Sequence, residues 1–129
     1  MKLVDEAGAL AAMRHAQARV VTVAIDQMRF HEPIRIGDLV VLQAEVTYVG
    51  RTSLETRVQV LAEDPVSGER SHANTAYLVY VALDESGRPK PVPPLIAETE
   101  AERRRMEAGR ERQAYRLAER ERERMDESA

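Results

Sequence analysis

An aspartate near the start of an apolar helix is the residue of this sequence best placed to do chemistry. The segment Leu3–Met13 is almost wholly apolar, and a helix that is apolar all round is usually buried. Asp5 lies within it, although aspartate is rarely buried without a partner. The pattern predicts either an acid at the edge of the buried zone, favoured there by the helix dipole, or a carboxylate with a chemical task.

The elements that must position this aspartate are four predicted strands. Arg19–Phe30 is rich in β-branched residues, and apolar and polar residues alternate in Leu39–Val49, in the strand that begins at Leu54, and in Ser71–Leu83. In the second strand the alternation places five side chains on one face: Val40, Leu42, Ala44, Val46 and Tyr48. One apolar helix and four antiparallel strands predict an α+β fold, with the sheet wrapped around the helix and a second subunit covering the rest.

The composition changes sharply near residue 98. Four prolines between residues 89 and 94 predict an extended segment that leaves the last strand. From Glu98 onward Glu and Arg recur at helical spacing, for example Glu100 with Arg104, which is typical of a solvated helix. The sequence therefore predicts a compact domain at residues 1–97 and a charged helical tail at residues 98–129, and it favours a solvated tail over a stable coiled coil.

Composition excludes several classes of function. The chain has 129 residues, no cysteine and a formal net charge of −3, so disulfides and Cys-based chemistry are excluded and a basic footprint for nucleic acid is absent. One Phe, four Tyr and no Trp give no stacking platform for single-stranded bases. No apolar run approaches the ~20 residues of a membrane span, and no signal peptide is recognisable. We expect no membrane association and a cytoplasmic location.

The sequence also lacks the common signatures of metal, serine and nucleotide sites. The three histidines (His15, His31 and His72) show neither helical two-His spacing nor suitable acidic neighbours, so no metal is predicted. No serine lies in a Gly-x-Ser-x-Gly elbow, and no glycine-rich phosphate loop occurs. We therefore expect no resident cofactor.

Four segments, in order, resemble the hotdog-fold acyl-CoA thioesterases. Val4–His15 resembles the central helix of that family, Tyr48–Leu54 its second signature, Asn74–Tyr77 its last strand, and Pro91–Pro93 its exit segment. The resemblance extends over about Leu3 to Leu117. It implies a hotdog fold, a homodimer at minimum and often a trimer of dimers, with active sites between subunits that hydrolyse acyl-CoA to a free acid and CoA. Family members also have a leading strand with Asn or His and a Gly-Gly turn before the helix, whereas this sequence begins within the helix.

The resemblance gives the candidate site residues their roles. Asp5 matches the catalytic carboxylate of the family and is assigned as general base or nucleophile. Arg51, Thr52 and Ser53 combine a guanidinium and two hydroxyls that can bind the phosphates of CoA, although a polar turn would have the same composition. Gly8 is interpreted as a point of close approach or as room for the acyl chain, and Asn74 and Thr75 are weaker candidates for lining the cleft.

The predicted function is hydrolysis of an acyl-CoA thioester, with CoA entering as part of the substrate. The alternative is a hotdog module that binds acyl-CoA without hydrolysing it and has a regulatory role. Release of free CoA that depends on Asp5 would distinguish the two.

Overall fold

The computed structural model describes residues 2–30 and 32–128. The elements follow in the order α1 (Lys2–Ala16), β1 (Arg19–Phe30), β2 (Leu39–Val49), β3 (Ser53–Glu63), β4 (Arg70–Leu83) and α2 (Glu100–Ser128). The chain divides into two compact units, Met1–Leu95 and Ile96–Ala129, close to the boundary predicted after residue 97. The candidate site lies in the first unit.

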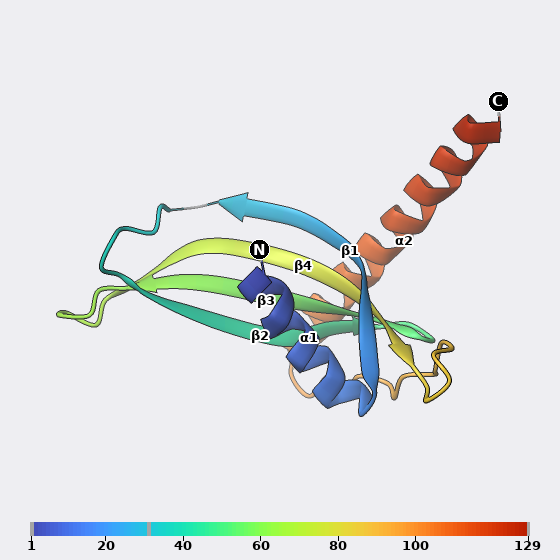
Figure 1. The fold of residues 1–129 in the computed structure, drawn as a ribbon, viewed down its shortest axis with the longest axis horizontal. Helices are drawn as coiled ribbons and strands as arrows, with labels where there is room; N and C mark the ends of the chain where they lie inside the picture. The colour runs from blue at the N-terminus through green and yellow to red at the C-terminus, as the bar shows by residue number, and fades with distance from the viewer. Residues whose placement is uncertain (1, 31, 129) are drawn as a thin grey trace. The chain divides into compact units, whose positions relative to one another are not determined.

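The four strands form one antiparallel sheet in the order β1-β4-β3-β2, and α1 lies across one face of it (Figure 1). The β2–β3 and β3–β4 connections are hairpins, whereas the first strand, β1, pairs with the last strand, β4. This arrangement confirms the predicted α+β fold with an antiparallel sheet packed on an apolar helix. Both β1 and β2 are edge strands, so each carries a row of backbone groups that the sheet does not pair.

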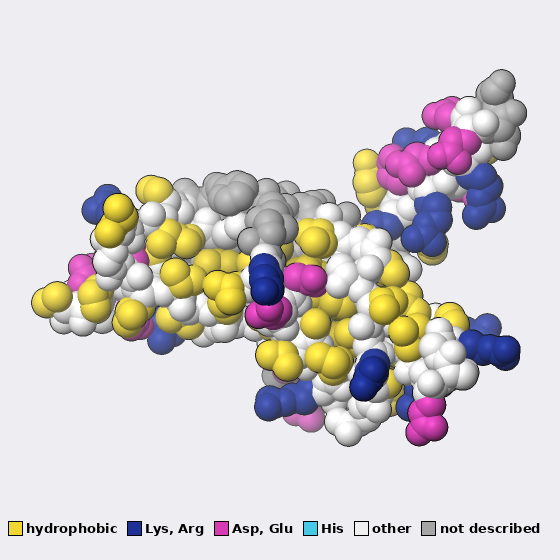
Figure 2. Space-filling model, viewed as in Figure 1, with side chains coloured by type: hydrophobic (Ala, Val, Ile, Leu, Met, Phe, Trp, Pro, Cys, Tyr) yellow, Lys and Arg dark blue, Asp and Glu magenta, His cyan; other side chains and the backbone are white. Residues whose placement is uncertain are grey.

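Apolar side chains are exposed on the face of the first unit that carries α1 (Figure 2). Leu3 and Leu10 of α1 are 62% and 65% exposed, and Leu39 and Val40 at the start of β2 are about half exposed. The helix therefore buries only one side within a single chain. The exposed apolar side of α1 is the surface that the sequence predicts to be covered by a second subunit.

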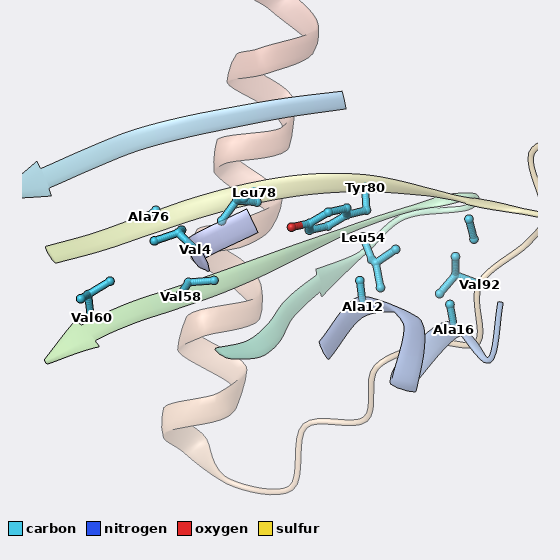
Figure 3. Packing of buried hydrophobic residues seen from close by; sticks show 11 residues of the cluster. Val4, Ala12, Ala16, Leu54, Val58, Val60, Ala76, Leu78, Tyr80 and Val92 are labelled. Atoms are coloured by element: carbon cyan, nitrogen blue, oxygen red, sulfur yellow. The ribbon is translucent and has the colours of Figure 1, made fainter. Parts of the chain in front are cut away.

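The buried stripe of α1 repeats every four residues, at Val4, Gly8, Ala12 and Ala16. These side chains are small, so the helix approaches the sheet closely and packs on the residues of β3 and β4 that point toward it. Figure 3 shows this core, in which the sheet contributes Leu54, Val58, Val60, Ala76, Leu78 and Tyr80. The predicted alternation of β3 is confirmed by these buried positions.

One predicted face is wrong beyond Val46 of β2. The register shifts between Val46 and Tyr48, so that Val46 pairs with Thr56 and Tyr48 pairs with Glu55. Thr47 is the extra residue of this bulge; it is buried and its hydroxyl donates to the Glu55 carboxylate over 2.6 Å. Because a bulge reverses the alternation after it, Val49 rather than Tyr48 packs against the core.

The second unit contains the predicted charged helix. Thr99 caps α2, since its Oγ1 accepts the Glu102 backbone N–H over 3.1 Å. The predicted pair Glu100–Arg104 is an ion pair in the structure, and so are Glu119–Arg122 and Glu121–Arg124. Such exposed pairs contribute only tenths of a kcal/mol each, and the helical propensity of the segment supplies the rest.

Candidate functional site

The Asp5 carboxylate is held by two hydroxyl groups that meet the same oxygen. Thr22 Oγ1 donates to Asp5 Oδ1 over 3.0 Å, and the Tyr80 hydroxyl lies 3.0 Å from both Oδ1 and the Asp5 backbone oxygen. Asp5 itself is half-buried in the first turns of α1. Among the described residues nothing hydrogen-bonds to Oδ2. The carboxylate therefore has one oxygen that is fixed and one that can accept a proton.

Strand register brings the two hydroxyls together. Thr22 on β1 is directly opposite Tyr80 on β4, so their side chains share the face of the sheet that carries α1. The register shifts immediately after this pair, between Thr22 and Ala24. A bulge at this point re-aims the following side chains without disturbing the pair itself.

Among the described residues, Tyr80 has the largest fully buried side chain, with 0% of its surface exposed. Its ring packs among the core residues, with the hydroxyl turned toward the first turn of α1 (Figure 3). Burial raises the pKa of the Tyr80 phenol well above its usual range, and the hydrogen bond to Asp5 and the negative charge of that carboxylate add to the rise. The phenol is thus a hydrogen-bond donor throughout the physiological pH range.

Gly8 lies directly over the Tyr80 hydroxyl. A Cβ at this position would be 2.6 Å from the Tyr80 oxygen, 2.9 Å from Thr56 Oγ1 and 3.3 Å from a Val58 methyl group. The close approach of helix and sheet gives a packing reason for a residue that otherwise weakens a helix. A role for Gly8 in substrate binding stays a prediction.

The proposed CoA-binding residues lie in the turn between β2 and β3. Gly50 N–H donates to the Ser53 carbonyl over 2.8 Å to close the turn, and the Arg51 side chain is exposed. Ser53, where the turn ends and β3 begins, pairs with Val81, the residue after Tyr80. This end of the turn therefore lies about 3 Å along β4 from Tyr80. The structure therefore brings this segment to the same end of the sheet as Asp5, Thr22 and Tyr80, here called the Asp5 cluster.

Asn74 and Thr75 lie away from that turn. They precede Tyr80 on β4 by six and five residues, a separation of about 20 Å for Asn74. Asn74 is 8% exposed and lines an apolar pocket of about 490 Å³ together with Leu3, Val4, Val40, Leu42 and Val60. Thr75 instead hydrogen-bonds the His72 ring over 2.6 Å, and alternation places it on the other face from Asn74.

The histidines make ordinary hydrogen bonds where they are described. His15 Nε2 contacts the Pro93 carbonyl at 2.8 Å, and His31 lies outside the described residues. Within residues 2–30 and 32–128, no group of three His, Asp or Glu side chains is arranged to hold a metal ion. Neither α1 nor α2, as far as they are described, combines the length and the apolar character needed to cross a membrane.

Comparison with known proteins identifies the family. The family model described as the thioesterase superfamily matches residues 1–69, which include α1, the strands β1–β3 and the Asp5 cluster except Tyr80. The chain belongs to the thioesterase superfamily. It is 40% identical over 115 residues to a cytosolic acyl coenzyme A thioester hydrolase of Mus musculus, a match that covers 87% of this chain and 30% of the mouse protein. The chain thus spans less than a third of that relative.

Solved structures of the superfamily confirm the predicted hotdog fold. An acyl-CoA hydrolase from Staphylococcus aureus, solved with butyryl coenzyme A, coenzyme A and coenzyme A disulfide, matches with a TM-score of 0.88 and 36% identity, over 97% of this chain and 76% of that one. A hexameric acyl-CoA thioesterase matches with a TM-score of 0.86 and 41% identity, over 92% of this chain and 76% of that one. The strand order and the central helix described above are therefore those of a hotdog domain.

Sequence reasoning missed Thr22, Tyr80 and Thr56. Each lies in a strand where a hydroxyl fits the alternation as well as an aliphatic residue, so the local pattern gives no signal. Thr22 and Tyr80 are 58 residues apart, and only the β1–β4 register joins them.

Proposed function

We propose that this chain hydrolyses acyl-CoA thioesters to a carboxylic acid and CoA. The observation that carries the proposal is the Asp5 carboxylate, with Oδ1 held by Thr22 and Tyr80 and Oδ2 without a partner among the described residues. It lies at the start of a buried helix, beside an apolar pocket and at the same end of the sheet as an arginine-containing turn. A fixed base, an acyl site and an anion site are what thioester hydrolysis requires.

Two routes are compatible with this carboxylate. As a general base, Asp5 takes a proton from water while the water oxygen attacks the thioester carbon; the C–S bond then breaks and the departing thiolate takes up a proton. As a nucleophile, Oδ2 attacks the same carbon, CoA leaves, and water hydrolyses the resulting anhydride. Hydrolysis in H₂¹⁸O under single-turnover conditions identifies the second route when water attacks Cγ of the Asp5 anhydride, because only then does ¹⁸O enter the Asp5 side chain.

Solved variants of the S. aureus hydrolase support the pairing of Asp5 with Thr22. In two of those structures an aspartate and a threonine 17 positions further along are each replaced by alanine. Asp5 and Thr22 are also 17 positions apart and are joined by a hydrogen bond. We assign Thr22 to the same site, as the residue that holds Asp5 Oδ1 from the β1 side.

The apolar pocket beside Asp5 is the proposed site of the acyl chain. Leu3 and Val4 precede Asp5 directly, and from them the pocket runs over β2 and β3 toward Ile34 and Asn74. Its lining is predominantly apolar, so burial of methylene groups there contributes about 0.8 kcal/mol each. Because Asn74 lines this pocket, the proposal assigns it to the acyl site, and it assigns no substrate contact to Thr75.

The other end of the substrate is assigned to the β2–β3 turn. Arg51 presents an exposed guanidinium there, next to the hydroxyls of Thr52 and Ser53. Charge-assisted hydrogen bonds from these groups suit the phosphates of CoA. CoA is then a substrate and product, and the proposal requires no resident cofactor or metal.

The proposed enzyme is a homodimer or a larger oligomer. The edge strand β1 pairs with β4 on one side only, and its residues Val21, Val23 and Ile25 are each about 45% exposed. Leu3 and Leu10 leave an apolar side of α1 uncovered. Solved relatives include hexameric thioesterases, and the mouse relative is described as cytosolic. A hexameric assembly and a cytoplasmic location follow as proposals for this chain.

A thiol-release assay across acyl-CoA chain lengths tests the function. The expected result is stoichiometric release of CoA thiol at a rate that saturates with substrate. Tight binding of acyl-CoA without release would instead support the regulatory module and overturn the proposal. The chain spans less than a third of its mouse relative, so the assay tests the activity of this chain itself.

A further inference from the structure

We propose that Tyr80 is a positioning residue that fixes the Asp5 carboxylate for catalysis; this inference rests on the proposed hydrolase function. The Tyr80 hydroxyl contacts Asp5 twice, at Oδ1 and at the backbone oxygen, both at 3.0 Å. It therefore joins the reactive group to the sheet at two points. Neither contact involves substrate, so Tyr80 acts through Asp5.

Packing alone does not explain why residue 80 carries a hydroxyl group. The residue is fully buried within a core of Leu54, Leu78 and Val58, where phenylalanine would fill nearly the same space. A buried hydroxyl is unfavourable unless it is hydrogen-bonded. Both acceptors of the Tyr80 hydroxyl belong to Asp5. Asp5 thus supplies both acceptors of this hydroxyl, and the Thr56 side chain on β3 also interacts with the phenol.

The arrangement at Oδ1 shows why one hydroxyl is insufficient. Thr22 approaches from the edge strand β1 and is itself exposed, whereas Tyr80 approaches from the central strand β4 and is immobilised by the core. A carboxylate held only by Thr22 can rotate about its Cβ–Cγ bond. With both donors on Oδ1, the lone pairs of Oδ2 keep one direction, and small misplacements of a reacting group cost large factors in rate.

Gly8 supports the same role from the helix side. The absence of a Cβ lets the α1 backbone pass over the Tyr80 oxygen, where a methyl group would be at 2.6 Å. The helix can therefore bring Asp5 down onto a hydroxyl that comes from the sheet. A larger residue at position 8 and a hydroxyl at position 80 cannot be accommodated together without movement.

The test compares Tyr80→Phe with Tyr77→Phe, which makes the same chemical change on the opposite face of β4. We expect Tyr80→Phe to lower kcat by about 10- to 100-fold with KM for acyl-CoA within about twofold of wild type, because Tyr80 orients the reacting group and leaves substrate binding intact. Tyr77→Phe should retain the wild-type kcat. Incorporation of 4-fluorophenylalanine at position 80 keeps an atom at the para position but cannot donate, so it should lower kcat to the same extent.

The outcomes separate the inference from the function on which it rests. A wild-type protein that releases CoA, with kcat unchanged in Tyr80→Phe or in the fluorinated variant, overturns the role of Tyr80 and leaves the hydrolase intact. Equal losses in kcat and in urea midpoint for both tyrosine variants would show a structural role only and would also overturn it. A wild-type protein without hydrolysis overturns both proposals.

Discussion

Replacing Gly8 with alanine should destabilise the protein, although alanine is the better helix former. In an open helix the change would stabilise by about 1 kcal/mol. Here the new Cβ would meet two oxygens closer than 3.0 Å, and both belong to side chains that are fully buried. Overpacking of this kind costs about 1–3 kcal/mol, and displacing the Tyr80 hydroxyl from Asp5 costs about 1 kcal/mol more. We expect a net loss of about 1–3 kcal/mol in the free energy of unfolding, the sum of these three effects.

Urea unfolding of four proteins measures this effect: wild type, Gly8→Ala, Tyr80→Phe and the double variant. Removing the Tyr80 oxygen relieves the 2.6 Å contact, so the double variant should be less unstable than the sum of the single changes by about 1 kcal/mol. Gly8→Ala should also reduce kcat, since the Tyr80–Asp5 contact is disturbed. A Gly8→Ala protein more stable than wild type by the helix-propensity difference would refute the close approach.

Three further predictions concern other parts of the first unit. Hydrogen bonds from the Ser86 hydroxyl and the Arg88 backbone hold the pKa of Asp84 below its ordinary 3.8. This carboxylate therefore stabilises the turn above pH 3.8 and loses its effect as the pH falls through the lowered pKa. The thermal midpoint of Asp84→Ala should lie below that of wild type by a constant amount near neutral pH, and the difference should shrink in acid. Arg51→Ala should raise the CoA inhibition constant several-fold, whereas Arg70→Ala, at the opposite end of the sheet, should not; equal values for both would remove Arg51 from the CoA site. Because the pKa of Tyr80 is raised, its phenol should stay protonated at about pH 11, and Tyr80→Phe should leave the tyrosinate absorbance at that pH almost unchanged.

The sequence predicted the elements well because their signals are local. The limits expected for the strands Arg19–Phe30 and Leu39–Val49 are those observed, since β-branched composition and period-two alternation are properties of a single strand. The face of Tyr48 was predicted wrongly because the bulge at Thr47 arises from pairing with Glu55, a contact between strands. Alternation within one strand carries no information about such a shift.

The candidate site was predictable only where one segment carried it. Asp5 was found because an acid interrupts an apolar helix, whereas its partners Thr22 and Tyr80 depend on a β1–β4 register that no local pattern encodes. Asn74 was predicted to line the cleft and Arg51 to bind CoA, and these two residues lie toward opposite ends of the sheet. The separation follows from the length of the strands, at about 3.3 Å per residue.

Turnover by Asp5→Asn tests the central claim most directly. Asparagine keeps the size of the side chain and an oxygen that can accept from Thr22 and Tyr80, but its amide cannot act as the base or nucleophile. We expect kcat for acyl-CoA hydrolysis to fall at least about 1000-fold, while binding of acyl-CoA and the oligomeric state remain those of wild type. Near-wild-type release of CoA by Asp5→Asn would contradict the assignment of Asp5 as the group that performs the chemistry.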